Sequence, residues 1–543
     1  MDNTEIADRL ETFAMMLELV EANPYTARAY RRAAETIRGA AVPVADLVRK
    51  NRVRELRGIG SGIEARLREL VDTGQIAELS ELERELSPDL VGLGRYLGLS
   101  ARRSVQLARS LGVRTAEELR EAAAAGRLRD VPGIGAKTEA RLLEVLARED
   151  GPRPREGLLL SRARELVGTV AAAVGGEPAG DVRRWRDSCE WLAVVSAAIV
   201  PEPVLDRFVA LPQIVAVVER DERRAVGVTV EGVPIELTAA DPARFGTELV
   251  RATGSPAYVA ALEPLPLAPD EHAVYAALEI PWCPPELREE PFRGEPPPLV
   301  EVGEIRGDLH CHTTWSDGRA SVEEMGRAAR ERGYDYMAIC DHSPAVGAVR
   351  GLTPDDLRRQ AVEIAAANEA LAPFRVLRGI ECDILPDGRL DLPDDVLAEL
   401  DWVQASVHGG QRMPAPQMTR RVEEALRNPY VRCLSHPTGR YINRRPENAL
   451  DLDRIFEVAL EEGVALEVNG LPLRLDLSGG HVRNALRAGV EIACSTDAHS
   501  VVGLGNMVLA VATARRGWAT AANVANTRPL EEILGPRRAR KAA

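Results

Sequence analysis

Apolar residues recur at spacings of three and four along the first 150 positions, with short Gly-containing breaks between the runs. This is the period of an amphipathic helix, so the pattern predicts an all-helical N-terminal region. The proline-rich joint GPRPREG (151–157) closes that region. Beyond it, strand-like runs such as WLAVVSAAIV (191–200) and PIELTAA (234–240) are mixed with helical stretches. Residues 158–293 are therefore predicted to form an α+β domain.

A second proline cluster, GEPPPLVEVGE (294–304), leads into the last part of the chain. From there, apolar strand-like segments alternate with amphipathic helical segments seven times. Such alternation favours a parallel sheet, and seven units favour a barrel. A chain of 543 residues also exceeds one hydrophobic core, which stops growing near ~250 to 300 residues. We expect a multidomain protein: helical domains at 1–80 and 81–152, the α+β domain at 158–293, and a distorted (β/α)7 barrel at 300–543.

Composition indicates the cellular compartment in which the protein is expected to work. The N-terminus carries Asp, Glu and Arg, and we find no apolar signal-peptide core in it. A membrane span needs a run of ~18 uncharged apolar residues, and the sequence has no such run. Seven cysteines without a CxxC pair argue against a disulfide framework or a zinc ribbon. We therefore expect a cytoplasmic protein without a membrane partner, and the sequence leaves its oligomeric state open.

The net charge of −14 argues against a nucleic-acid partner, but its distribution matters more than its sum. LRGIGSGIEARLREL (56–70) and VPGIGAKTEARLLEVL (131–146) repeat one pattern, and a weaker copy lies at 96–113. One Gly-containing turn is common to many helix pairs, so the repetition carries the inference. The repeat resembles the helix-hairpin-helix DNA-binding motif, in which glycines let a turn approach a phosphate next to a helix N-terminus. The candidate contacts, which ignore base sequence, are Gly58, Gly60, Gly133, Gly135 and Lys137.

Ligand-type side chains occur where the strands of the predicted barrel end, which is where such a barrel builds its active site. Six of the eight histidines are placed this way, together with three carboxylates: His310, His312, Asp317, His342, Glu381, His408, His436, Asp497 and His499. A single histidine at a strand end is more often structural than a ligand. Six of them with three acids predict a metal site, because imidazole and carboxylate together suit Zn²⁺, Mn²⁺ or Fe²⁺.

The motifs that carry these residues are DLHCHTTWSDG, CDHSPA, GIECDIL, VHGG, SHPTGR and STDAHS. They resemble the polymerase and histidinol phosphatase (PHP) domain. The resemblance implies three ions, with Mn²⁺ as the usual activating ion, and hydrolysis of phosphate esters. We expect Mn²⁺ or Zn²⁺, with Fe²⁺ as a further candidate. By matching motif, the first ion would take His310, His312, Glu381 and Asp497. Glu381, His408 and His436 would hold the second ion, and Asp317, His342 and His499 the third. Arg440 is a candidate phosphate contact, with an exposed helix-capping arginine as the alternative reading.

The order of helix-hairpin-helix region, α+β domain and PHP domain resembles the bacterial family X DNA polymerases over nearly the full length. Members carry a Gly-Ser-x-Arg-Arg turn followed by Asp-x-Asp, and a third acid on a later strand, to hold two Mg²⁺. Here the turn is Gly180–Arg184 with Asp181 in place of Ser, and Trp191 and Ala193 fall where the Asp pair belongs. Glu236 matches the third acid. We therefore expect a degenerate palm and thumb without nucleotidyl transfer, with Arg183 and Arg184 as candidate DNA contacts.

These observations predict a DNA-repair enzyme: a metal-dependent 3′-5′ exonuclease and 3′-phosphatase acting on gapped or 3′-ended DNA. Three alternatives stay open. The chain could be a working gap-filling polymerase with a proofreading PHP domain, a phosphatase for a small phosphomonoester, or a DNA-end binding module with structural metals. Structural metal sites are usually closed four-ligand shells, which disfavours the last. Which of exonuclease, 3′-phosphatase and abasic-site cleavage dominates is not decided by the sequence.

Overall fold

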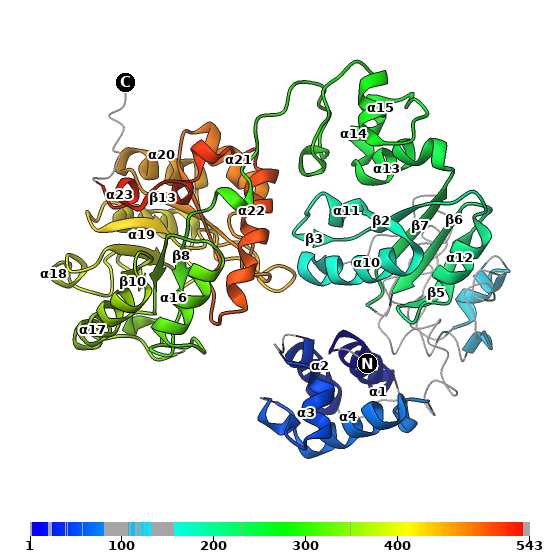
Figure 1. Ribbon diagram of the computed structural model, residues 1–543, viewed down its shortest axis with the longest axis horizontal. Coiled ribbons are helices and arrows are strands. Elements are labelled where there is room, and N and C mark those ends of the chain that lie inside the picture. Colours follow the sequence, from blue (N-terminus) through cyan, green and yellow to red (C-terminus); the bar gives the residue numbers. More distant parts are fainter. Residues whose placement is uncertain are drawn as a thin grey trace.

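The computed structural model describes residues 3–80 apart from 20–23, 39, 41 and 57, short stretches between 107 and 131, and residues 157–535 apart from 230 and 348. Figure 1 shows the described parts as a blue helical group at the N-terminus, a cyan and green α+β part, and a barrel that runs from green to red. Within these residues, no helix combines the length and the apolar character needed to cross a membrane.

The N-terminal residues form the predicted helices. The helices are α1 (Asn3–Leu19), α2 (Pro24–Arg38), α3 (Val44–Arg49) and α4 (Ser61–Thr73), with the short η1 (Val53–Glu55) before α4. Apolar residues at helical spacing, such as Ile6, Leu10 and Phe13, are buried in one core shared by these helices. Gly58 has φ +87°, a left-handed conformation that glycine adopts without strain. It lies three residues before α4, so the first predicted hairpin turn is followed by a helix N-terminus.

The α+β part is built on a five-stranded sheet with the order β2-β4-β7-β6-β5. The strands are β2 (Gly176–Ala179), β4 (Leu192–Ala197), β5 (Ile214–Arg220), β6 (Arg224–Thr229) and β7 (Pro234–Ala240). β4 and β7 are parallel, and the other pairs are antiparallel. A two-stranded pair, β1 (Leu158–Leu159) and β3 (Ser188–Cys189), lies beside it. Helices α10 (Leu160–Val174), α11 (Gly180–Arg183) and α12 (Glu202–Val209) accompany the sheet. Following the resemblance, we call residues 157–240 the palm.

Three short helices follow the palm and form what we call the thumb: α13 (Phe245–Thr253), α14 (Pro256–Leu262) and α15 (Glu271–Ala277). Their own core contains Tyr258 and Tyr275, whose hydroxyl oxygens lie 2.8 Å apart. Ser255 and Asp270 cap α14 and α15 by accepting a hydrogen bond from a backbone N–H in the first turn.

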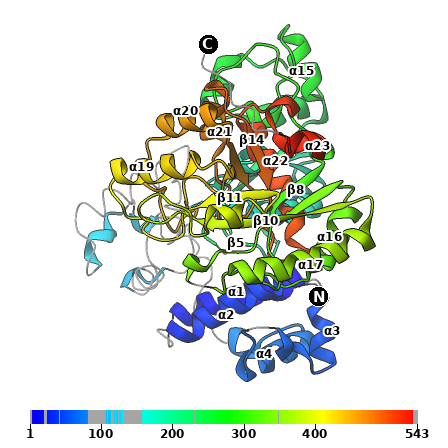
Figure 2. The same ribbon diagram turned by 90° about the vertical axis from the view of Figure 1, so that its left-hand side faces the viewer.

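Seven parallel strands make the C-terminal barrel, in the chain order β8 to β14 across the sheet. They are β8 (Gly307–Cys311), β9 (Tyr336–Ile339), β10 (Arg375–Asp383), β11 (Trp402–Ser406), β12 (Val431–Leu434), β13 (Ala465–Asn469) and β14 (Ile492–Ser495). A helix follows each strand: α16 (Val322–Glu331), α17 (Pro354–Leu371), α18 (Asp394–Leu397), α19 (Ala415–Leu426), α20 (Leu452–Glu462), α21 (Gly479–Arg487) and α22 (Met507–Arg516). Figure 2 shows the strands enclosed by these helices.

The barrel is nearly closed. A parallel bridge joins Cys311 at the end of β8 to Ala498 just after β14, and the His312 amide donates to the Ala498 carbonyl at 2.9 Å. Strands β8, β9, β11, β13 and β14 are buried along their whole length. Strands buried on both sides are typical of a sheet covered by crossover helices. The predicted seven-unit α/β barrel is confirmed, and its closure brings the carboxyl ends of all seven strands around one opening.

Candidate metal centre

The nine residues expected as ligands lie at the carboxyl ends of the barrel strands. His310 is in β8, and Glu381 is in β10. The others follow a strand directly or within a few residues: His312 and Asp317 after β8, His342 after β9, His408 after β11, His436 after β12, and Asp497 and His499 after β14. Neighbouring ring centroids are 4.2 Å apart for His312 and His499, and 5.3 Å apart for His408 and His436. Residues nearly 200 positions apart therefore share one cluster.

Glu381 lies in the middle of this cluster and is 1% exposed. Its Oε2 atom lies 3.0 Å from Nδ1 of His342 and 3.5 Å from Nε2 of His310. Its Oε1 atom lies 2.8 Å from Nε2 of His436 and 3.4 Å from Nε2 of His408. One carboxylate thus faces imidazoles from four strands, an arrangement that suits a carboxylate bridging two cations.

A second set of short distances surrounds Asp497 and Asp317. Oδ1 of Asp497 lies 3.1 Å from Nε2 of His312 and 3.9 Å from Nε2 of His310. Oδ2 of Asp317 lies 3.2 Å from Nε2 of His499, and its Oδ1 lies 3.7 Å from Nε2 of His342. Nδ1 of His499 lies 3.7 Å from Asp497 and Nδ1 of His312 lies 3.9 Å from Asp317, so each acid has three histidines around it.

The donor atoms gather into three overlapping groups, each compact enough to hold an ion. The groups are His310, His312 and Asp497; His342, Glu381 and His408; and His312, Asp317, His342 and His499. The sequence comparison with PHP motifs gave three sets as well, but His312 and His342 each enter two of the geometric groups. His436 is in none of them and reaches the cluster through Glu381.

The electrostatics of the cluster suit bound cations. Burial alone would raise the pKa of Glu381 and of Asp497, but the surrounding imidazoles hold both far below their usual range. Burial also opposes charge on His408 and His499, yet the acids raise their pKa values to about 10 and about 9. Burial and the charge of His499 lower the pKa of His312 to about 3. Buried carboxylates that stay ionised among histidines make a site that favours bound cations.

Three ring nitrogens test whether metals fit. The Nδ1 atoms of His312, His342 and His436 are buried and have no hydrogen-bond partner. Buried polar atoms are otherwise nearly always satisfied, and a metal ion can take the place of the missing partner. The backbone is also special here, since His436 and Asp497 have φ values of +27° and +53°. Such left-handed conformations cluster at functional sites.

Several residues in contact with the cluster are not among the nine expected from the sequence. Oε1 of Glu467 lies 2.7 Å from Nδ1 of His310, and its Oε2 accepts a hydrogen bond from the backbone amide of His436 at 2.6 Å. Asp383 lies 3.2 Å from Nδ1 of His408. The one available signal for Glu467 was an acid inside the apolar run VALEVNG at the end of a predicted strand.

Arg474 is the third such residue. It is 6% exposed, and its Nε atom lies 3.7 Å from Oδ2 of Asp497 without a hydrogen-bond partner. Its guanidinium stacks on Tyr441 at 4.6 Å from the ring centroid. A buried cation at the edge of the ligand cluster is suited to contact with a phosphate oxygen.

The candidate DNA contacts are placed as follows. Gly58 and Gly60 lie before α4, and Gly133, Gly135 and Lys137 are outside the described residues. Arg183 forms a bidentate pair with Glu271, and Arg184 contacts Asp181, Glu289 and the Thr253 carbonyl. Arg440 pairs with Asp187 at 2.8 Å. These three arginines have partners within the protein, so a role in DNA binding stays a prediction for each.

Known protein families match the N-terminal helices and the C-terminal barrel separately. Residues 1–76 match the helix-hairpin-helix domain family, and residues 308–470 match the PHP domain family. The DNA polymerase/3′-5′ exonuclease PolX of Bacillus subtilis (strain 168) is 35% identical over 566 residues, which covers 98% of this chain and 99% of that protein.

Two shorter relatives cover parts of the chain. A probable phosphatase of Acetivibrio thermocellus is 32% identical, over 35% of this chain and 78% of the relative. A probable phosphatase of Thermoanaerobacter sp. (strain X514) is 27% identical, over 40% of this chain and 89% of the relative. The helix-hairpin-helix region, the barrel with its metal-competent cluster and the full-length similarity agree, and the chain therefore belongs to the bacterial family X DNA polymerases that carry a PHP domain.

Proposed function

We propose that the barrel hydrolyses phosphate esters at the 3′ ends of DNA, as a 3′-5′ exonuclease and a 3′-phosphatase. The observation that carries this proposal is the convergence of six histidines and three acids in one cluster, in a chain that also has a helix-hairpin-helix region. The full-length relative is named as a polymerase and 3′-5′ exonuclease, which supports the exonuclease part.

We further propose that the nine residues hold three ions, Mn²⁺ or Zn²⁺, with Fe²⁺ as a further candidate. When bound, such ions lower the pKa of water and neutralise charge on the phosphate oxygens. Glu381 would bridge two of the ion positions, because its two oxygens face different histidines. Glu467 and Asp383 fix the ring orientation of His310 and His408, as carboxylates behind metal-bound histidines do. Arg474 would neutralise a phosphate oxygen beside Asp497.

We infer that the palm has lost nucleotidyl transfer. Trp191 directly precedes β4, and Ala193 in β4 pairs with Glu236 in β7, so the strand positions of the expected Asp pair carry no carboxylate. Glu236 itself is paired with Arg224 at 3.0 Å. Asp181 uses its carboxylate to accept from the amides of Glu190 and Trp191 and from Arg184, which is a structural role. A single acid cannot hold the two Mg²⁺ ions that polymerisation requires.

The test uses purified full-length protein with Mn²⁺ and labelled oligonucleotides. A recessed 3′-hydroxyl end should be shortened, and a 3′-phosphate should be released, while gapped DNA with all four nucleotides should not be extended. The matched control is the Glu381→Ala variant, which should neither shorten the 3′-hydroxyl end nor release the 3′-phosphate. Template-directed extension by the wild type would refute the loss of the polymerase, and an untouched 3′ end would refute the nuclease.

A second candidate is hydrolysis of a small phosphomonoester by the barrel. The two relatives named as probable phosphatases favour it, because they match 35% and 40% of the chain rather than the whole. The two candidates differ in what the N-terminal region contributes. If DNA is the substrate, phosphate release from a 3′-phosphorylated oligonucleotide should exceed release from a small phosphomonoester at equal concentration. The opposite order would favour the second candidate.

A further inference from the structure

The palm contacts the metal centre through two barrel loops. One loop (437–447) follows β12 directly after His436, and the other (470–478) follows Asn469 at the end of β13. Asn469 donates to Oδ2 of Asp497 at 3.1 Å, so both loops start at groups of the centre. Ile442 of the first loop and Leu475 of the second are buried in the hydrophobic core of the palm. Each loop therefore has one end in the metal centre and its apolar tip in another domain.

Asp187 provides the polar anchor of this junction. It lies in the palm between α11 and β3, three residues after the turn that the polymerase resemblance assigns to nucleotide phosphate. Its Oδ2 atom lies 2.8 Å from a guanidinium nitrogen of Arg440, and its Oδ1 lies 3.7 Å from Arg516. Nearby, the Asn443 side chain donates to the Gly157 carbonyl at 2.6 Å. A carboxylate of the palm thus holds an arginine of the barrel loop.

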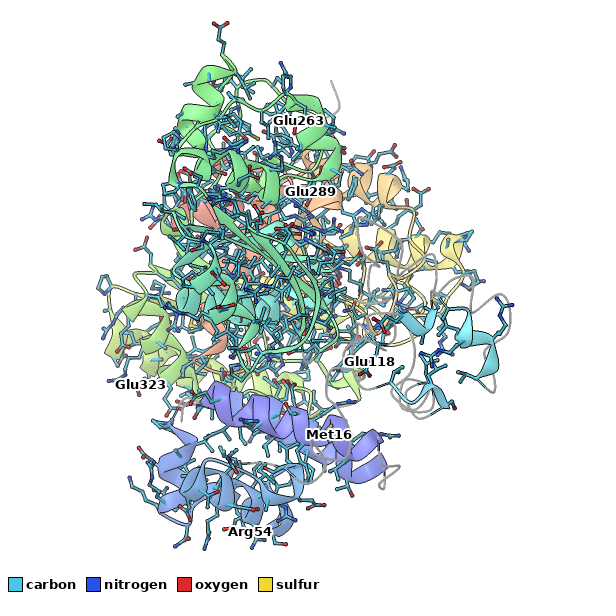
Figure 3. All side chains as sticks on the ribbon, turned by 90° about the vertical axis from the view of Figure 1, so that its right-hand side faces the viewer. Met16, Arg54, Glu118, Glu263, Glu289 and Glu323 are labelled. Carbon is cyan, nitrogen blue, oxygen red and sulfur yellow. The ribbon has the colours of Figure 1, made fainter. Side chains whose placement is uncertain are left out.

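Arg440 connects Asp187 to the second loop through hydrogen bonds. Its Nε donates to the Arg474 carbonyl at 3.0 Å, and a terminal nitrogen donates to the Leu475 carbonyl. The backbone of Arg474 is therefore fixed by the same side chain that Asp187 holds. The Arg474 guanidinium then lies against Asp497 of the centre. Glu289 at the base of the thumb, which is labelled in Figure 3, adds a contact to Arg516 at 3.7 Å.

We propose that Asp187 is a positioning residue for phosphate-ester hydrolysis in the barrel: through Arg440 it holds the 470–478 loop so that Arg474 stays beside Asp497. The inference rests on the proposed function. The palm then has a role that needs no polymerase carboxylates, because its Asp187 positions a side chain of the nuclease site. The metal ligands bind without Asp187, whereas the placement of the guanidinium depends on it.

The test compares Asp187→Ala, Asp187→Glu and Glu286→Ala in the full-length protein. Glu286 is the matched control because it forms another ion pair between domains, 2.8 Å to Arg515, with side chains that are 8% and 17% exposed. The Asp187 and Arg440 side chains are 24% and 13% exposed. Neither Glu286 nor Arg515 lies in the two loops. The readouts are kcat and KM on a 3′-ended oligonucleotide with Mn²⁺, bound metal, and hydrogen exchange of peptides within 437–447 and 470–478.

Asp187→Ala should lower kcat about tenfold, the effect of losing ~1.4 kcal/mol of transition-state stabilisation, while bound metal stays at the wild-type level. Asp187→Glu should recover most of kcat. Exchange in the two loops should be faster in Asp187→Ala and unchanged in Glu286→Ala. Equal kcat losses in the two alanine variants, or unchanged exchange in Asp187→Ala, would overturn the proposal.

The exchange measurement does not depend on activity. If the wild type leaves every DNA 3′ end untouched, the proposed function fails. The loop exchange of Asp187→Ala then still decides whether the palm carboxylate holds the Arg474 loop.

Discussion

Nδ1 of His310 lies 2.7 Å from Oε1 of Glu467, although the two residues are 157 positions apart in the chain. Both side chains are fully buried. Burial would raise the pKa of Glu467, but the charge of His310 and the hydrogen bond to it hold the pKa at about 2. An ionised Glu467 therefore fixes which nitrogen of His310 faces the cluster, and Nε2 is the one turned toward Glu381 and Asp497.

The first prediction concerns Glu467→Gln. The amide keeps the volume but loses the charge that orients His310, so metal affinity should fall about 10- to 100-fold, as for other carboxylates behind metal-bound histidines. Titration with Mn²⁺ followed by calorimetry measures this change. Glu399→Gln is the control, since Glu399 forms a surface pair with Arg358. Equal affinities in the two variants would contradict the role assigned to Glu467.

Removal of a ligand should separate catalysis from DNA binding. His310→Ala and Glu381→Ala are expected to abolish cleavage of 3′-ended DNA, because each removes a donor from the centre of the cluster. DNA affinity should stay close to wild type, since the helix-hairpin-helix region is in the N-terminal part. Fluorescence anisotropy at fixed salt and an end-trimming assay test both statements. A parallel loss of affinity in both variants would place DNA binding in the barrel instead.

Metal ions should also stabilise the barrel. Ions that bind only the folded state add about 2.7 kcal/mol at a concentration one hundred times Kd. Treatment with a chelator should therefore lower the Tm of the protein, and added Mn²⁺ or Zn²⁺ should restore it. The Glu381→Ala variant serves as the comparison, because its Tm should respond less to the same additions. A Tm that is indifferent to chelation and to metal would argue against a resident metal.

Asp181 gives a prediction about the palm. Asp181 is 6% exposed, and its carboxylate pairs with Arg184, which is 5% exposed. Asp181→Ala leaves a buried arginine without this partner, and breaking such a pair costs about 3 to 5 kcal/mol. Denaturant unfolding measures the loss. Asp206→Ala is the matched control: it removes a pair with Arg220 in which Asp206 is 60% exposed, and such surface pairs contribute about 0 to 1 kcal/mol. A similar small loss in both variants would contradict the structural role of Asp181.

Glu271 links stability to pH. Burial would raise its pKa, but the hydrogen bonds from Arg183 and Arg288 outweigh it and lower the pKa to about 2 from an ordinary 4.5. Because the folded pKa is lower, the stabilisation is complete above pH 4.5 and is lost as the pH falls toward 2. Glu271→Gln should lower the free energy of unfolding by about 3 kcal/mol at neutral pH.

The matching measurement is urea unfolding of wild type and Glu271→Gln between pH 7 and pH 3. The difference between the two proteins should shrink as the pH falls, since the wild type gradually gains the proton that the amide mimics. A difference that stays constant with pH would show that the loss comes from packing rather than from the charge of Glu271.

Much of this architecture was predictable because it follows from the local spacing of apolar and polar residues. Side chains alternate along a strand, so the two-residue spacing of His310, in β8, and His312, directly after it, favours the same side for both. The alternation of apolar strands and amphipathic helices predicted the seven-unit barrel and put the ligands at its carboxyl ends. The sequence likewise shows that Trp191 and Ala193, rather than carboxylates, stand where the resemblance places the Asp pair.

The grouping of the ligands was decided by the tertiary structure. Which histidine shares an ion position with which acid depends on how far neighbouring strands are staggered and on where the barrel closes, at the Cys311–Ala498 bridge. Glu467 is an acid in an apolar run by sequence, and it becomes the partner of His310 only when β13 and β8 are folded into one barrel. The role of Arg440 could not be predicted from the sequence either. Its contact with Asp187 joins two domains, and no local pattern records such a contact, because it depends on the packing of surfaces from distant parts of the chain.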